Sequence, residues 1–361
     1  MSGQRGALAA ALAGSLPASR TCVGDSRALL DCAWHEGVLG LLAARVDGQP
    51  EVPEPVRAAC ADWIRAQTAV LMMRQVRLRQ VLVALDEARI RPLVLKGAAL
   101  SQWLYPSPHL REASDVDLLF ASRIDAERAS ATLASLDFFT PYRPGRFQHE
   151  LLCRSADGKL DLDLHWALSD WPMLGQIPDF TTLLEASIPL PGLGTHARGL
   201  DAPHALLHAC IHRASNLAAG LGDRLKWLYD LHLLAAVLDR DGHWPRFVAA
   251  CLQAQACGIA DEGLAASAGL FGTVVPGPVR QALADGRKSE PLDAGRLSDW
   301  RYIQRLNFRA LPGWGARLAW LGDRLLPPAG HLRALYGEDL GYPRLLWRRL
   351  RRAGSRLVGL G

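Results

Sequence analysis

The chain has 361 residues, of which 49% are hydrophobic and 21% charged, and its formal net charge is +5. These proportions are ordinary for a globular protein and exclude a collagen, a coiled coil and a wholly disordered chain. At roughly 150 residues per domain, the length predicts two or three domains with cores that need no disulfide or structural metal. No apolar run exceeds about ten residues, whereas a membrane-spanning helix needs about 20, so no transmembrane segment is expected.

The seven cysteines are odd in number and scattered, and none forms a Cys-x-x-Cys pair. This usage predicts reduced, mostly buried thiols in a cytoplasmic protein. The Ala-rich segment 7–18 is interpreted as part of an amphipathic first helix rather than as a signal peptide, because little positive charge precedes it.

The hydrophobic periodicity predicts helices through most of residues 3–88, and the pattern changes at Arg91. A compact block of strands and helices is expected from there to residue 168. Its predicted elements are a short apolar strand at 92–96, a helix at 97–104, a strand at 114–120, a helix at 124–136, and two hairpin strands at 147–153 and 159–166.

A Pro/Gly-rich stretch follows and ends near Gly199, and Asp201 is a suitable N-cap for the first of a series of further helices. These are predicted at 201–216, 223–238, 244–254, 261–270, 279–284 and 297–306. The segment 342–360 is rich in arginine with leucines between. It is typical of a solvated amphipathic helix, and it could also lie on a membrane surface or on RNA.

The strongest chemical signal is the Asp115-Val-Asp117 motif in an apolar strand. Side chains alternate along a strand, so both carboxylates point to one face. Two like charges in an apolar setting are costly unless a cation neutralises them, and carboxylate oxygens suit Mg²⁺. The alternative is an exposed strand with both aspartates in water.

A second acidic motif lies in the later hairpin, where Asp161, Asp163 and His165 alternate with leucines. If this strand lies beside the first, the carboxylates could form a cluster for two Mg²⁺ ions about 4 Å apart. A hairpin with one polar face in water explains Asp161 equally well, and the residues alone leave open whether Asp161 or Asp163 is the third ligand.

Upstream, Lys96-Gly97 stands at a predicted strand-to-helix junction. Glycine allows close approach of a phosphate to the backbone, and a helix N-terminus favours negative charge. Arg111 could clamp a phosphate through its fork of donors. Lys226 and Asp230 are spaced i,i+4, which by itself predicts a surface salt bridge.

The order of these motifs resembles the nucleotidyltransferase superfamily, and most closely its family 5, within the DNA polymerase beta-like fold. The resemblance covers roughly residues 90–235. It is carried by Leu95-Lys-Gly97, Leu100, Tyr105, Arg111, Ser114-Asp-Val-Asp-Leu-Leu119, Asp163-Leu-His-Trp166, Leu207-His208, His212 and Leu225-Lys-Trp-Leu-Tyr-Asp230.

The resemblance implies an α+β fold, with a small mixed sheet of the nucleotidyltransferase type between N-terminal and C-terminal helical regions. The expected divisions are a helical region at 1–88, the α/β core at 89–200 and a helical domain at 201–361. The turn after Lys96 is Gly97-Ala98, without the serine of the wider superfamily pattern.

The implied activity is Mg²⁺-dependent transfer of a nucleoside monophosphate from an NTP to an acceptor hydroxyl or phosphate, with release of pyrophosphate. By resemblance, Asp115 and Asp117 bridge two Mg²⁺ ions, and Asp163 is the third ligand and helps to activate the attacking hydroxyl. The nucleotide-binding residues implied are Lys96, Gly97, Arg111, Ser114, His212, Lys226 and Asp230. 

The sequence does not identify the acceptor. It is compatible with a small molecule, a modified peptide, a protein or an RNA end as the acceptor. Two alternatives come from other classes of protein: a degenerate module that binds nucleotide without turnover, and an RNA-binding module that uses the basic helices.

Overall fold

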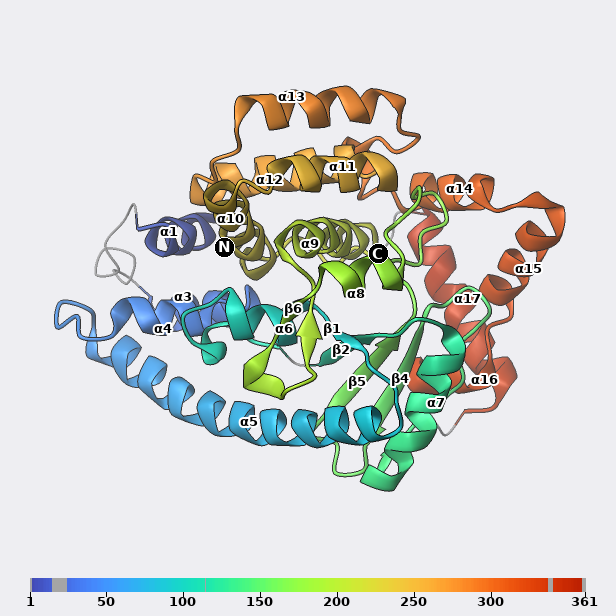
Figure 1. Cartoon of the computed structure of the whole chain (residues 1–361), viewed down its shortest axis with the longest axis horizontal. Helices are drawn as coiled ribbons and strands as arrows, with labels where there is room; N and C mark the ends of the chain where they lie inside the picture. The colour runs from blue at the N-terminus through green and yellow to red at the C-terminus, as the bar shows by residue number, and fades with distance from the viewer. Residues whose placement is uncertain (1, 15–24, 114, 337–339, 359–361) are drawn as a thin grey trace.

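The computed structural model describes residues 2–14, 25–113, 115–336 and 340–358 (Figure 1). Its helices are α1 (Ser2–Leu12), α3 (Ser26–His35), α4 (Leu39–Val46), α5 (Glu54–Glu87), α6 (Lys96–Trp103), α7 (Arg123–Leu133), α8 (Phe180–Ala186), α9 (Ala202–Ala218), α10 (Leu225–Asp241), α11 (Trp244–Ala254), α12 (Cys257–Phe271), α13 (Gly277–Gly286), α14 (Trp300–Ala310), α15 (Gly313–Leu325), α16 (Ala329–Tyr336) and α17 (Tyr342–Val358).

The strands form one mixed sheet in the order β3-β4-β5-β2-β1-β7-β6. Their bounds are β1 (Leu93–Val94), β2 (Val116–Leu119), β3 (Phe138–Phe139), β4 (Glu150–Ser155), β5 (Asp161–His165), β6 (Ile188–Pro189) and β7 (Arg198–Gly199). The β2–β5 and β1–β7 pairs are parallel, and the other neighbours are antiparallel. This mixed sheet between helices confirms the predicted α+β class.

The four predicted strands correspond to β1, β2, β4 and β5, whereas β3, β6 and β7 lie where the sequence predicts none. Each of these three is only two residues long, so it carries no alternation that could be recognised. The Pro/Gly-rich stretch before Gly199 also contains α8. The sheet is therefore wider than the motifs alone indicate.

Strand alternation gives the sheet two different faces. Leu118 of β2 and Leu162 and Leu164 of β5 are fully buried and pack with Leu85 of α5 and Leu133 of α7. The residues between them face the opposite side, where α9 and α10 lie (Figure 1). The polar side chains of β2 and β5 are thus directed towards the C-terminal helices.

The helix α9 begins where its N-cap predicts, because the Asp201 side chain accepts a hydrogen bond from the backbone N–H of His204. Its buried leucines join a continuous core that extends from Leu8 of α1 to Ile303 of α14. The N-terminal helices therefore pack on the C-terminal helices although a sheet separates them in the sequence.

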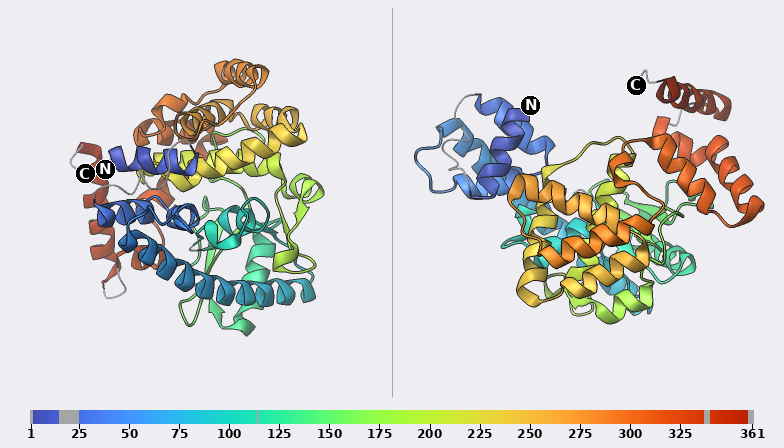
Figure 2. Two further views of the ribbon diagram at one scale, coloured as in Figure 1. Left: turned by 90° about the vertical axis from the view of Figure 1, so that its left-hand side faces the viewer. Right: turned by 90° about the horizontal axis from the view of Figure 1, so that it is seen from above.

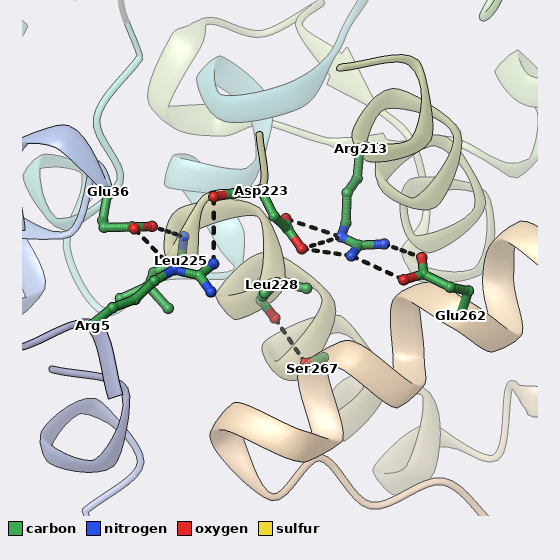
Figure 3. A network of polar contacts seen from close by, with 8 residues as sticks. All are labelled: Arg5, Glu36, Arg213, Asp223, Leu225, Leu228, Glu262 and Ser267. Carbon is green, nitrogen blue, oxygen red and sulfur yellow. Dashed lines mark hydrogen bonds and ion pairs between the residues drawn. The ribbon is translucent and has the colours of Figure 1, made fainter. Parts of the chain in front are cut away.

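A network of ion pairs reinforces this contact (Figure 3). Glu36 accepts hydrogen bonds from Arg5 Nε at 2.9 Å and from the Leu225 backbone N–H at 2.7 Å, so it caps α10 from a distant segment. Arg213 of α9 is buried and donates to Asp223 and Glu262. The network joins α1, α9, α10 and α12.

The described residues bear on the expected burial of the cysteines and on the expected lack of a transmembrane segment. Six of the seven cysteines are described, and all six are buried, as predicted; Cys22 lies outside the described residues. No helix in the described part of the chain is long and apolar enough to cross a bilayer.

Candidate active site

The site is built on the pairing of β2 with β5. These strands are parallel neighbours, and their register places Asp117 directly opposite Asp163. Residues paired across adjacent strands point to the same face, so the two carboxylates lie side by side on the face towards α9. His165, two residues after Asp163, shares that face because strand side chains alternate.

These three side chains form a compact group that offers metal ligands. One ligand atom each from Asp117, Asp163 and His165 lies within 4.8 Å of the other two. Asp117 is buried, and the other two are half-buried. Two carboxylates and an imidazole at this spacing are a suitable donor set for a divalent cation.

Two cationic or donor groups converge on one oxygen of Asp117. Lys96 Nζ lies 2.5 Å from Asp117 Oδ1, and His165 Nε2 lies 2.8 Å from the same atom. An ionised carboxylate only accepts hydrogen bonds, so His165 Nε2 carries the proton. Burial alone would raise the pKa of Asp117, but the hydrogen bond from His165 and the charge of Lys96 outweigh it and hold that pKa far below its usual range.

The two aspartates have opposite electrostatic settings. Burial, and then the neighbouring charges of Asp117 and Glu150, raise the pKa of Asp163 to about 7. The charge of His165 opposes this rise in the pKa but does not outweigh it. One carboxylate is therefore always charged near neutral pH, and the other exchanges a proton there.

Asp115 and Asp161 lie at the margins of this group. Asp115 precedes β2 and is exposed, and its charge contributes to raising the pKa of Asp163. Asp161 accepts two hydrogen bonds from Arg154 of the neighbouring strand, at 3.0 and 2.9 Å. The structure thus brings Asp163, and not Asp161, into contact distance of Asp117.

Lys96, the first residue of α6, lies beside the acids. Lys96 has a left-handed backbone with φ of +49°, a conformation that is costly for a residue with a side chain. Gly97 is buried, and a Cβ there would lie 3.1 Å from both Ala113 Cβ and Arg111 Nη1. In this structure the glycine allows close packing of α6 against residues 111–113.

Arg111 and Asp230 form a buried pair that links the sheet region to α10. Arg111 donates to Asp230 through Nε at 2.8 Å and through Nη2 at 2.7 Å, and Tyr105 Oη donates to the same carboxylate at 2.7 Å. The predicted surface salt bridge between Lys226 and Asp230 is wrong, because Asp230 is buried and satisfied by Arg111 and Tyr105. Helical spacing alone does not reveal a partner 119 residues away.

A pocket opens beside Lys96 between the sheet and the C-terminal helices. Its lining includes Lys96, Arg111, His212 and Asp230 from the predicted nucleotide-binding set, together with Trp103, His208 and Trp227. Burial and the charge of Lys96 lower the pKa of His212 to about 3, so its ring is neutral.

Gly97 and Lys226 of the predicted nucleotide-binding set are not among the described residues that line this pocket. Lys226 is half-buried, and burial and then the charge of Arg111 lower its pKa. Ser114 lies outside the described residues.

Sequence reasoning did not assign His165 to the site, although its spacing from Asp163 places it on the same strand face. Trp103 gave no comparable signal, since its position depends on how α6 packs. His208 belongs to the Leu207-His208 motif that carries the resemblance, although no role was assigned to it.

The mixed sheet flanked by helices is consistent with a fold of the nucleotidyltransferase type. The profile of a family described as an uncharacterised nucleotidyltransferase matches residues 24–272 of this chain. The chain belongs to this family, as the order of its motifs predicted, and the match extends beyond residues 90–235 in both directions. No curated protein and no solved structure was found to match it.

Proposed function

We propose that the protein transfers a nucleoside monophosphate from an NTP to an acceptor hydroxyl or phosphate, with release of pyrophosphate, in a Mg²⁺-dependent reaction. The observation that carries the proposal is the register that sets Asp117 opposite Asp163. His165 and Lys96 both form hydrogen bonds to the Asp117 carboxylate. Membership of a nucleotidyltransferase family supports the reaction class.

The donor set fits a hard divalent cation. Asp117 and Asp163 supply oxygens on two rigid strands, and Asp115 supplies a further carboxylate at the edge of β2. We therefore assign Asp115, Asp117 and Asp163 as metal ligands. His165 donates to Asp117, so its proposed role is to position that carboxylate. When bound, two Mg²⁺ ions would neutralise the triphosphate and stabilise the entering and leaving oxygens.

The proton of the acceptor needs a base at the reacting centre. We propose that the carboxylate of Asp163, which a bound cation would hold ionised, accepts that proton from the hydroxyl. The hydroxyl oxygen forms a bond to the α-phosphorus as the bond from the α-phosphorus to the bridging oxygen breaks, and pyrophosphate leaves with the electron pair.

The residues around the pocket supply positive charge for the triphosphate. Lys96 is the cation closest to the acids, and Arg111 lines the same pocket. The neutral ring of His212 also lines this pocket and is proposed to contact the nucleotide without adding charge. We propose that Lys96 contacts the phosphates, that Gly97 and Ser114 are further nucleotide-binding residues, and that the Arg111–Asp230 pair holds the wall of the pocket. Lys226 is proposed as a second phosphate ligand from α10.

The test is incubation of the protein with Mg²⁺, each of the four NTPs labelled at the α-phosphorus, and a cell extract that supplies acceptors. We expect transfer of the label from at least one NTP, together with release of pyrophosphate. Asp117→Asn and Asp163→Asn should lower the rate by at least about a hundredfold, because they remove charge at the reacting centre.

Asp161→Asn is the matched control, since Asp161 lies on the same strand but is paired with Arg154. Its rate should stay close to that of the wild type. Equal labelling by wild type and Asp163→Asn, or transfer of the γ-phosphate instead of the α-phosphate, would contradict the proposal.

A further inference from the structure

The helix α15 carries an apolar stripe on its outer surface. Trp314, Leu318, Leu321 and Leu325 follow one another at intervals of four, three and four residues, which places them on one helix face. Their exposed fractions are 70%, 64%, 38% and 56%, respectively. Trp320 lies on the other face and is buried. The stripe therefore lies on a different face of α15 from the face that packs on the rest of the molecule.

The stripe lies in the part of the chain that holds its excess positive charge. Residues 300–361 contain twelve arginines and three acidic residues, a net charge of +9. The whole chain has a net charge of +5, so residues 1–299 carry −4. Asp323, the one acidic residue of this segment that the structure describes, accepts a hydrogen bond from the Arg146 backbone and so faces the body of the molecule.

The neighbouring helices present their arginines outwards. In α14, Ile303 is buried, whereas Arg305 and Arg309 lie on the opposite face and are exposed. In α17, Trp347 is 60% exposed beside the exposed residue Arg348.

These helices lie together at one edge of the molecule. Arg349 of α17 donates to the carbonyl oxygen of Arg324 at 3.3 and 3.2 Å, so α17 contacts the end of α15. Figures 1 and 2 show α14–α17 grouped at one edge, away from α1, α3 and α4.

We propose that the surface formed by α14, α15 and α17 docks on an anionic lipid bilayer. Exposed leucines gain free energy by entering the boundary between headgroups and acyl chains, where tryptophan is also favoured. Arginines around them are attracted to anionic headgroups. A nucleic acid would satisfy the arginines but would leave the leucine stripe in water. The proposal does not depend on nucleotidyl transfer.

The experiment is sedimentation of the full chain with vesicles of phosphatidylcholine alone, or of equal parts phosphatidylcholine and phosphatidylglycerol. We expect binding to the anionic vesicles only, and weaker binding at high salt. The double variant Trp314→Ser, Leu318→Ser should lower the partition coefficient by about tenfold or more, because it removes apolar area that the bilayer would bury. Arg305→Gln with Arg309→Gln should weaken binding and its dependence on salt.

Val274→Ser is the control, since Val274 is 72% exposed and lies outside this surface. It should bind vesicles like the wild type. All variants change exposed side chains, and circular dichroism melting curves verify that they fold. The proposal is overturned if the wild type does not sediment with anionic vesicles, or if the double variant sediments equally well. Binding of single-stranded RNA that the double variant retains, without binding of vesicles, would assign the surface to RNA instead.

Discussion

The two facing aspartates show how the same residue type takes different chemical roles. Asp117 is held ionised by Lys96 and His165. Burial and the negative charges nearby instead raise the pKa of Asp163. Such a separation of pKa values between neighbouring carboxylates is typical of catalytic sites. At this scale the structure supplies one permanent anion and one group that can exchange a proton near pH 7.

This difference predicts how cation binding depends on pH. Because Asp163 has a pKa of about 7 without a cation, binding must displace its proton at lower pH. The affinity for Mn²⁺ should rise by about tenfold per pH unit between about pH 5 and pH 7 and then level off. Isothermal titration calorimetry in buffers of different ionisation enthalpy would also detect release of one proton at the lower pH. An affinity that is constant over this range would contradict the assignment.

The same shift has a consequence for stability without a cation. The pKa of Asp163 is raised above its unfolded value of 3.8, so the folded chain binds the extra proton between about pH 4 and pH 7. The contribution of this group to stability is therefore present at low pH and is lost as the pH rises through about 7.

At the scale of elements, the Arg111–Asp230 pair joins the sheet region to α10. Both side chains are almost completely buried, at 7% and 4% exposure, and the contact is bidentate. Asp230→Ala would leave the guanidinium buried without a counter-charge. We expect the free energy of unfolding to fall by about 3–5 kcal/mol.

Urea denaturation measures this loss directly. Asp161→Ala breaks the more exposed pair with Arg154 and serves as the comparison, with an expected cost of no more than about 1 kcal/mol. Similar losses in the two variants would mean that the Arg111–Asp230 pair does not hold the two regions together.

Elements with a local signal could be predicted from the sequence, and those that depend on distant partners could not. The strands β2 and β5 alternate apolar and polar residues, and α9 has its own N-cap, so each was recognisable. In contrast, β6 and β7 are two residues long and exist through pairing with each other and with β1. The register between β2 and β5, which unites Asp117 with Asp163, is likewise a property of the folded sheet.

For the site, the sequence indicated the aspartates and Lys96 but not what each contacts. The ion pair of Lys96 with Asp117 and the hydrogen bond from His165 join residues that are 21 and 48 positions apart. The division of the chain near residues 88 and 200 stays a prediction.

At the scale of the whole molecule, one core unites segments that are far apart in the chain. Leu42 of α4, Leu207 of α9 and Leu264 of α12 belong to the same buried cluster. The network around Glu36 and Arg213 adds polar contacts between α1, α9, α10 and α12 (Figure 3). The helices around the sheet therefore hold the pocket wall in place against the strands that carry the acids.

The charge of the molecule is also unevenly distributed. The excess of arginine lies in α14–α17, whereas the remainder of the chain is net acidic. The proposed membrane surface and the proposed active site consequently lie on separate elements, and variants of one should leave the other intact.

The most direct test of the central claim is a count of divalent ions bound by the purified protein. Electron paramagnetic resonance of Mn²⁺ at about pH 8, where Asp163 is ionised, would measure this for the wild type and three variants. We expect bound Mn²⁺ in the wild type and in Asp161→Asn, and loss of binding in Asp117→Asn and Asp163→Asn. Equal binding by all four proteins, or by none of them, would contradict a metal site between β2 and β5.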